Sequence, residues 1–238
     1  MSIWGKIAGA GVGLAIGGPL GALLGGVAGH FAVDVPQAAG RPERDKVTFA
    51  VAMIALSAKM AKADGRVTRD EIDAFEEIFL VPPEEAARVR MLYNLAKEDV
   101  AGYQHYARQI ARIYANYPAV LEDVLDALFY VALADGVAHD KEIAFLENVA
   151  DIFGYTDAEF RRVKASHIGP DADDPFAIIG VSSDAGLDEI KQAWRRLARE
   201  NHPDALIARG VPEEFVKVAE KKLAAINAAY EKITAQRA

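Results

Sequence analysis

The sequence predicts an all-α protein on two observations. Apolar residues recur at helical spacing through most of the 238 residues, and no long stretch shows the apolar–polar alternation of a strand. Glycine is unevenly placed, since eleven of the nineteen glycines lie within the first forty residues. This length predicts two small domains with an appendage. We expect a glycine-rich N-terminal segment (1–33), a linker (34–45), a helical bundle (46–168) and a C-terminal domain with a helical hairpin (169–238).

The N-terminal segment is predicted to form a glycine-zipper helix. Glycine occupies every fourth position from Gly5 to Gly29, and Ile7 to Gly29 is a run of 23 residues without a charge. At about 1.5 Å per residue, such a run is long enough to cross the hydrocarbon layer of a membrane. The glycines would form a groove on which a second helix can pack closely. We therefore expect a membrane anchor through residues 7–29, and a homodimer or oligomer through Gly9, Gly13, Gly17, Gly21 and Gly25.

The charges that flank this run predict its orientation. Lys6 alone precedes it, whereas three basic residues follow it within 41–46. Positive residues favour the cytoplasmic side, so a single crossing would leave the C-terminal domains in the cytoplasm, with Trp4 as an interfacial anchor. A shallow hairpin bent at Pro19 is one alternative. A cleaved signal peptide is the other, although the sequence has no convincing small-x-small cleavage site.

From residue 46 onward the helical period becomes regular, which predicts a compact bundle. Pro82-Pro83 and Pro118 stand near expected helix starts, where a proline is best tolerated. The expected helices cover 46–62, 69–79, 83–97, 101–115, 119–134, 140–153 and 156–167.

An internal repeat lies within this bundle. Residues 63–72 are echoed by residues 134–143, and in each copy an Asp-Gly turn is followed by a glutamate seven positions after the aspartate. The pairs Asp64/Glu71 and Asp135/Glu142 are candidates for one shared site for a hard cation such as calcium. Each copy lacks the first half of an EF-hand loop, so an autonomous EF-hand is excluded. Structural capping is the favoured interpretation, with Gly65 and Gly136 ending helices and a Thr68–Glu71 capping box opening the next one.

The C-terminal domain contains a basic amphipathic helix followed by a proline stop. An apolar stripe at helical spacing covers one face of residues 187–200, and Lys191, Arg195 and Arg199 recur every fourth residue on another. Pro203 disfavours helix at the preceding residue. We therefore expect His202-Pro203-Asp204 to lie on a loop, with His202 and Asp204 available to a partner.

These residues resemble the J domain of the DnaJ family. Residues 174–181 are similar to its first helix and turn, 187–201 to its basic second helix, 202–204 to its signature loop and 223–233 to its third helix. The resemblance implies a co-chaperone that recruits a DnaK-type chaperone and stimulates its ATP hydrolysis. Asp204 is suited to a bidentate contact with an arginine, and a cationic helix steers toward an acidic surface. The expected chaperone-binding residues are His202, Pro203, Asp204, Lys191, Arg195, Arg196 and Arg199.

One position departs from that pattern, because Ala205 stands where the family often has lysine. Arg209 is a candidate replacement. The acidic repeat resembles the TerB family, and a glycine-rich start, a TerB-like bundle and a C-terminal J domain together resemble the DjlA-type membrane co-chaperones. That resemblance implies a bacterial inner membrane location. The alternative function is a metal- or stress-responsive TerB-type adaptor with a degenerate J-like tail.

Composition and missing motifs argue against other classes. The net charge of −8 argues against non-specific nucleic-acid binding. The absence of cysteine excludes a disulfide framework and a cysteine-based zinc site. The sequence has neither a Gly-x-x-x-x-Gly-Lys-Ser/Thr loop nor a His-Glu-x-x-His helix. We expect no enzyme activity, no required cofactor and a role as regulator of a partner ATPase.

Overall fold

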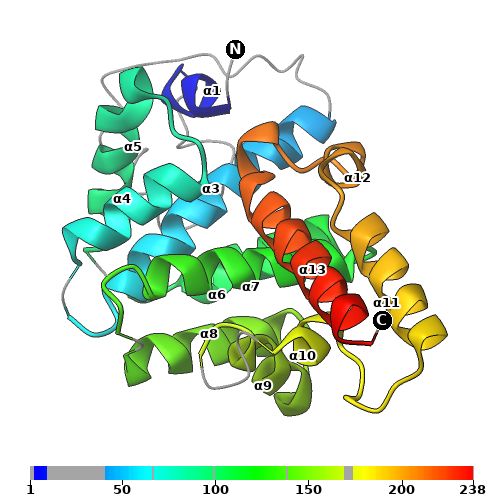
Figure 1. Ribbon diagram of the computed structural model, residues 1–238. Helices are drawn as coiled ribbons and strands as arrows, with labels where there is room; N and C mark the ends of the chain where they lie inside the picture. The colour runs from blue at the N-terminus through cyan, green and yellow to red at the C-terminus, as the bar shows by residue number, and fades with distance from the viewer. Residues whose placement is uncertain are drawn as a thin grey trace, which may run out of the picture.

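The computed structural model describes residues 3–9, 41–65, 67–98, 100–137, 139–168 and 174–237, and these residues form helices and turns without a strand. The all-α prediction is therefore confirmed (Figure 1). The helices are α1 (Ile3–Gly9), α3 (Arg41–Ala61), α4 (Arg69–Ile78), α5 (Pro83–Ala96), α6 (Tyr103–Ile113), α7 (Pro118–Ala132), α8 (Asp140–Ile152), α9 (Asp157–Ala165), α10 (Pro175–Ile179), α11 (Leu187–Glu200), α12 (Pro203–Ala208), the 3₁₀ turn η1 (Glu213–Phe215) and α13 (Lys217–Gln236).

The bundle is built around α3. Every residue of α3 from Phe49 to Ala61 is buried, which is the pattern of a helix covered on all sides. Its neighbours are α1, α5, α6, α7 and α8. Helix α7 is buried over most of its length and packs beside α3. These two helices form the centre of the bundle.

Local signals place the helix boundaries close to those expected. Prolines 83 and 118 are the first residues of α5 and α7, where the missing N–H leaves no bond unmade. Thr68 and Thr156 open α4 and α9 with complete capping boxes. Helix α3 begins at Arg41, five residues before the expected start at 46. No helix in the described ranges is long and apolar enough to cross a membrane. The glycines Gly13, Gly17, Gly21 and Gly25 of the expected zipper lie outside those ranges.

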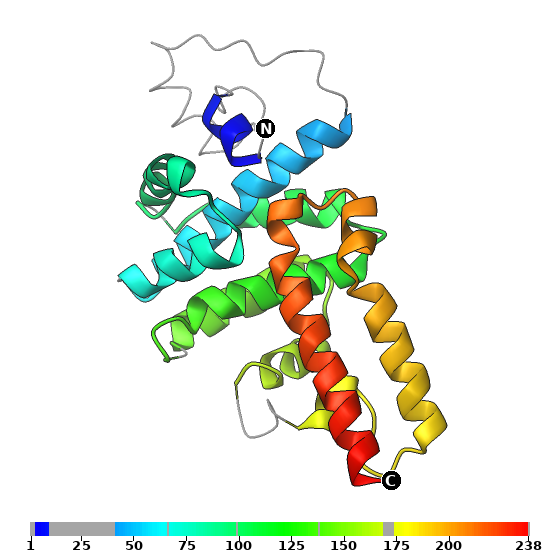
Figure 2. The ribbon, with the colours of Figure 1, turned by 45° about the horizontal axis from the view of Figure 1, so that its top comes forward.

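The C-terminal domain is an antiparallel hairpin of α11 and α13 with α10 packed against it (Figure 2). A separate apolar cluster holds it together, with Ile179 from α10, Ile190 from α11, and Ile226 and Ile233 from α13. Trp194 stacks on Tyr230 with ring centroids 4.4 Å apart. The Nε1–H of Trp194 also donates to Oδ1 of Asn227 at 2.8 Å.

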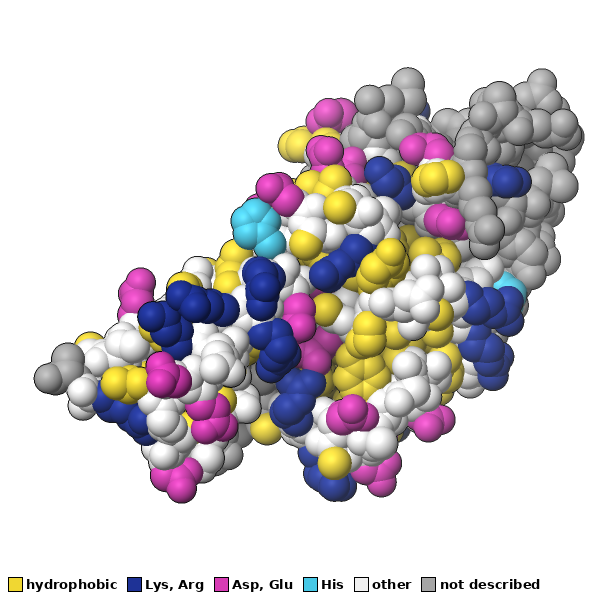
Figure 3. Space-filling model, turned by 90° about the vertical axis from the view of Figure 1, so that its right-hand side faces the viewer, with side chains coloured by type: hydrophobic (Ala, Val, Ile, Leu, Met, Phe, Trp, Pro, Cys, Tyr) yellow, Lys and Arg dark blue, Asp and Glu magenta, His cyan; other side chains and the backbone are white. Residues whose placement is uncertain are grey.

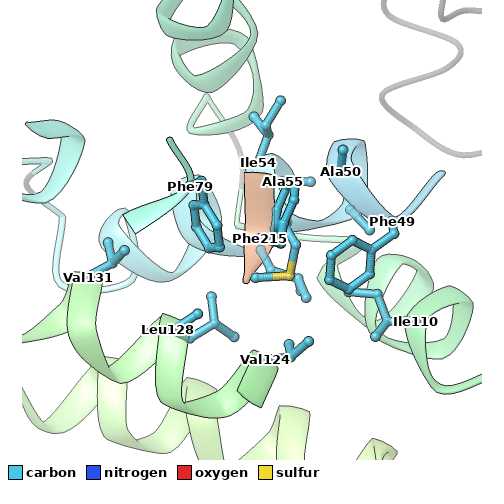
Figure 4. Close-up of a cluster of buried hydrophobic side chains, with 14 of the residues drawn as sticks. Phe49, Ala50, Ile54, Ala55, Phe79, Ile110, Val124, Leu128, Val131 and Phe215 are labelled. Atoms are coloured by element: carbon cyan, nitrogen blue, oxygen red, sulfur yellow. The ribbon is translucent and has the colours of Figure 1, made fainter. Parts of the chain in front are cut away.

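The hairpin and the bundle share one core at the connection between α11 and α13. Leu206, Val211, Phe215 and Val218 belong to the apolar cluster of the bundle. Figure 4 shows Phe215 among side chains of α3 and α7, beside Phe79. Its ring lies 5.0 Å from that of Phe49 and 4.8 Å from that of Phe79. The residues that follow the His-Pro-Asp tripeptide therefore attach the hairpin to the bundle.

Helix α1 packs into the same core. Ile3, Trp4 and Ile7 are each no more than 3% exposed. The sequence suggested Trp4 as an anchor at a membrane interface, and the structure differs. The indole is enclosed by the bundle and by Phe215, and the centroids of the Trp4 and Phe215 rings lie 5.4 Å apart.

Candidate functional site

The tripeptide 202–204 lies at the junction of α11 and α12. Asn201 ends α11 and is buried, and its side-chain amide donates to the carbonyl of Leu197 at 2.8 Å. His202 is the N-cap of α12, and its Nδ1 accepts the backbone N–H of Asp204 at 3.2 Å. Pro203 takes the first helical position. The expected loop is therefore a single N-cap residue followed at once by a short helix.

The two polar side chains of the tripeptide are exposed. The side chain of His202 is 55% exposed and that of Asp204 is 89% exposed. The Asp204 carboxylate lies 3.9 Å from Nδ1 of His202, and within the described ranges no lysine or arginine is at ion-pair distance from it. A carboxylate in this state can accept two parallel hydrogen bonds from a partner's arginine.

The basic side chains of α11 divide between two faces. Lys191, Arg195 and Arg199 are exposed, and Nε of Arg199 donates to the carbonyl of Arg195 at 3.2 Å. Arg196 forms an ion pair with Glu200 at 3.0 Å. It also borders the cavity between hairpin and bundle. We call Lys191, Arg195 and Arg199 the cationic ridge. Figure 3 views the molecule from the side of α11 and shows basic side chains gathered across its left and centre.

Arg209 does not extend the ridge. Its guanidinium donates to the carbonyl of Glu200 at 3.0 Å and lies over the ring of Tyr117 at 5.8 Å. It therefore satisfies a carbonyl at the end of α11 and fixes that end against the bundle. Tyr114 of the bundle adds a second contact, because its hydroxyl donates to the carbonyl of Gly210 at 3.2 Å. The guanidinium of Arg209, a candidate replacement for the family's lysine, is therefore engaged in contacts within the protein.

A largely buried ion network joins α13 to α7 and borders the cavity between the hairpin and the bundle. Nζ of Lys222 lies 2.8 Å from Glu122, 2.9 Å from Asp126 and 3.6 Å from Asp123. His167 also contacts Asp126, at 2.8 Å. Burial opposes ionisation of Asp126, but Lys222 and His167 outweigh it and hold its pKa below the ordinary value. Burial raises the pKa of Asp123 to about 7. Lys222 lowers it less than it lowers that of Asp126, because Lys222 is farther from Asp123.

The sequence gives little sign of Phe215 and Lys222, which position the tripeptide. Phe215 lies between two turns, and Lys222 is one of two adjacent lysines in an amphipathic helix. Their partners are about 100 to 210 positions away, so no local pattern reveals them. The one available signal was the presence of apolar residues in a segment expected to be a connection, namely Leu206, Val211 and Phe215.

The two acidic turns of the internal repeat come together. Glu71 of α4 and Glu142 of α8 are buried with their carboxyl groups facing each other, and the charge of Asp64 acts on both. The Oδ1 of Asp135 accepts a backbone N–H of its own turn at 2.9 Å, and its Oδ2 lies 3.4 Å from Nε2 of His139, which is also 3.9 Å from Oδ2 of Asp64. Three of the four candidate metal ligands therefore approach one another.

The expected capping role is present at the first turn. Oε2 of Glu71 accepts the backbone N–H and the hydroxyl of Thr68 at 2.6 and 2.7 Å, and the Thr68 hydroxyl accepts the N–H of Glu71. Gly65 and Gly136 have φ of 100° and 82°, the left-handed conformation expected in the turns after α3 and α7. Glu71 is therefore a helix-capping residue whether or not it has another role.

Glu142 has no comparable partner. No hydrogen bond of good geometry reaches either of its carboxylate oxygens within the described chain. Burial, together with the charge of the neighbouring Glu71, raises its pKa to about 8. The neighbouring Tyr93 hydroxyl is also buried and has no hydrogen-bond partner among the described residues. These groups are oxygen donors of the kind that hard cations prefer. However, no group of three or more histidine, aspartate or glutamate side chains in the described ranges is arranged to hold a metal.

Comparisons with known proteins divide the chain into the same three parts. Residues 1–41 match the family described as the co-chaperone DjlA transmembrane domain, residues 50–165 match tellurite resistance protein TerB, and residues 174–237 match the DnaJ domain. Co-chaperone protein DjlA of Photobacterium profundum is 28% identical over 97% of this chain and 98% of its own length. The protein of the same name from Legionella pneumophila is 28% identical over 97% and 94%, and that from Escherichia coli K12 is 27% identical over 100% and 99%. No solved structure matches the chain with significance.

Proposed function

Because the chain has the organisation of a DjlA-type co-chaperone, with DjlA transmembrane, TerB and DnaJ regions in order, we propose that it recruits a DnaK-type chaperone and stimulates its ATP hydrolysis. The N-terminal region matches a transmembrane domain, which marks the chain as membrane-anchored. The proposed site of action is the cytoplasmic face of a bacterial inner membrane. Hydrolysis would occur in the partner, and this chain would act as its regulator.

The observation that carries this proposal is the state of Asp204. Its carboxylate is almost fully exposed, has no cationic partner in the described part of the chain and is held on the first turn of a helix. The cationic ridge of α11 lies immediately before it along the chain. A partner with an acidic surface beside an arginine would find attraction over the ridge and a bidentate contact at Asp204.

A binding measurement tests this site directly. Full-length protein in detergent or membrane discs is immobilised, and binding of an ATP-bound DnaK-type chaperone is recorded. Asp204→Asn should weaken binding by about tenfold or more, since a charge-assisted contact contributes roughly 1.5–3 kcal/mol. Asp157→Asn, at an exposed aspartate of α9, is the matched control and should leave binding unchanged. Equal affinities for the wild type and Asp204→Asn would contradict the proposal.

A second measurement tests the ridge. Arg195→Glu reverses one charge of the ridge and should slow association, with an effect that shrinks as salt is added. Arg88→Glu is the matched control, because Arg88 of α5 has a side chain that is 63% exposed and lies on the bundle. An unchanged association rate with faster dissociation, or an effect insensitive to salt, would contradict a steering role.

A second candidate function is a cation-responsive role of the bundle, as in the TerB-type adaptor alternative. It is favoured by one observation: the two carboxylate oxygens of Glu142, beside Glu71 and Asp64, have no hydrogen bond of good geometry from the described residues. Calcium would have to draw the three side chains into a tighter arrangement. Calorimetric titration of the full-length protein with calcium, repeated with Glu142→Gln and with the exposed control Glu147→Gln, tests it. Heat and a raised melting temperature that only Glu142→Gln abolishes would support it, and their absence from the wild type would end it.

A further inference from the structure

The short helix α12, whose first turn carries the tripeptide, depends on its surroundings for its orientation. It has six residues, and an isolated helix shorter than about 12–15 residues is marginal in water. Figure 2 shows α12 at the end of the hairpin that lies against the bundle, away from the C-terminus. Leu206 of α12 is buried in the apolar cluster of the bundle. The direction in which Asp204 points is therefore set by contacts that α12 makes outside itself.

Arg209 ties the end of α11 to the bundle. Helix α11 itself packs on α10 and α13, and a cavity of about 760 Å³ is bordered by its Glu200 and by Tyr117 of the bundle. The guanidinium of Arg209 reaches back nine positions to the carbonyl of Glu200 and also lies over the ring of Tyr117. Glu200 is the last residue of α11, so its carbonyl has no partner within that helix. One side chain thus joins the start of the tripeptide segment to the bundle.

Two tyrosines at the end of α6 supply the bundle's side of these contacts. Tyr117 is the N-cap of α7 and is 40% exposed, so its ring lies over Arg209 from the edge of the bundle. Tyr114 is buried, and its hydroxyl donates to the carbonyl of Gly210, the residue after Arg209. A ring beneath a guanidinium adds a cation–π attraction to the hydrogen bonds. The residues that follow α12 are therefore held from both sides.

These contacts bear on the proposed docking of the chaperone. A bidentate contact with an arginine requires the carboxylate to face its partner in a defined direction. A rotation of α12 would leave Asp204 exposed but directed away from that partner. We propose that the bundle positions the tripeptide for the chaperone, with Tyr117 and Arg209 as the positioning residues. This inference rests on the proposed function, and it gives the bundle a part in that function without a contact between bundle and chaperone.

A double-mutant cycle tests the inference in the full-length protein, held in detergent or membrane discs. Binding of an ATP-bound DnaK-type chaperone is measured. Arg209→Ala and Tyr117→Ala should each weaken binding by about twofold to tenfold, since each removes one weak contact that orients α12. Tyr117→Phe keeps the ring and should restore the affinity. In an Asp204→Asn background, Arg209→Ala should have no further effect, because a positioning residue acts through the group that it positions.

The outcomes separate this inference from the proposed function. Arg88→Ala, at an exposed arginine of α5, is the control and should bind like the wild type. An effect of Arg209→Ala that persists in the Asp204→Asn background would overturn the inference, because Arg209 would then act independently of Asp204. Wild-type affinity in both Arg209→Ala and Tyr117→Ala would also overturn it. Equal affinities for the wild type and Asp204→Asn would refute the proposed function and this inference with it.

Amide hydrogen exchange gives a second readout that needs no chaperone. The backbone N–H groups of Ala205 and Leu206 both donate to the carbonyl of His202 in the first turn of α12. Arg209→Ala and Tyr117→Ala should speed exchange at these two amides by about twofold to tenfold, because α12 opens more often when its contacts with the bundle are weakened. Amides of α5 should exchange as in the wild type. Unchanged exchange in α12, or an equal acceleration in α5, would overturn the positioning role.

Discussion

Replacing Phe215 by alanine should destabilise the bundle as well as the hairpin. The side chain is 5% exposed and lies against the rings of Phe49, Phe79 and Trp4. Removing a buried phenylalanine side chain costs about 3–5 kcal/mol, and the cost is greater where the neighbours cannot close the space. A cavity of about 20 Å³ already borders Phe215, so the neighbouring side chains leave some space unfilled even with the ring present. We therefore expect a loss in the upper half of that range.

Thermal and urea unfolding of the full-length protein measure this effect. For a chain of this size, the expected loss lowers the melting temperature by roughly 8–20 °C. The two tryptophans separate the domains, because Trp4 reports on the bundle and Trp194 on the hairpin. Both signals should shift together in Phe215→Ala. Met91→Ala, on the exposed face of α5, is the control and should change stability by less than about 0.5 kcal/mol. An unchanged melting temperature, or a shift of the Trp194 signal alone, would refute the shared core.

The ion network and the tripeptide give further predictions. Lys222→Met should cost about 3–5 kcal/mol in urea unfolding, because it leaves the buried carboxylates of Asp123 and Asp126 without their lysine. Lys221→Met at the exposed neighbour should cost less than about 1 kcal/mol. Asp123 has a pKa of about 7, above its ordinary value, so the folded state holds its proton more tightly between about pH 4 and 7 and this residue's contribution to stability falls as pH rises through that window. Asp123→Asn should therefore gain stability relative to the wild type from pH 5 to pH 7, by at most about 1.4 kcal/mol per pH unit, and a constant difference would contradict this. His202→Ala removes the side chain that accepts the N–H of Asp204 and should destabilise the full-length protein by about 0.5–2 kcal/mol, measured by the same unfolding assay.

Much of the fold could be predicted from the sequence, because its signals are local. Helical period, prolines at first helical positions and the Thr68–Glu71 pattern set boundaries without knowledge of distant contacts. The hairpin was predicted from an apolar stripe, which includes Ile190 and Trp194, on an otherwise basic helix. Pro203 was a correct stop for α11. The same proline is the first residue of α12, with His202 as its N-cap. Pro203 was interpreted from the sequence only as the end of one helix, and the helix that begins there was therefore missed.

The parts that could not be predicted depend on tertiary contacts. The site of Lys222 is made by carboxylates about 100 positions earlier, and the pocket of Phe215 by α1, α3 and the end of α4. Trp4 is suited to an interface by composition, yet a buried acceptor and an aromatic pocket are available to it within the bundle. The convergence of Glu71 and Glu142 was a prediction of the repeat's symmetry. The contact of Asp135 with the backbone of its own turn was not predicted.

The most direct test of the central claim is the ATPase rate of a DnaK-type chaperone, measured against the concentration of the full-length protein in detergent or membrane discs. The wild type should give a saturable increase. His202→Gln should give little or none, and His139→Gln, the same change at a partly exposed histidine of the bundle, should match the wild type. Stimulation by His202→Gln equal to that of the wild type, or no stimulation by the wild type, would contradict the assignment of the tripeptide as the site that acts on the chaperone.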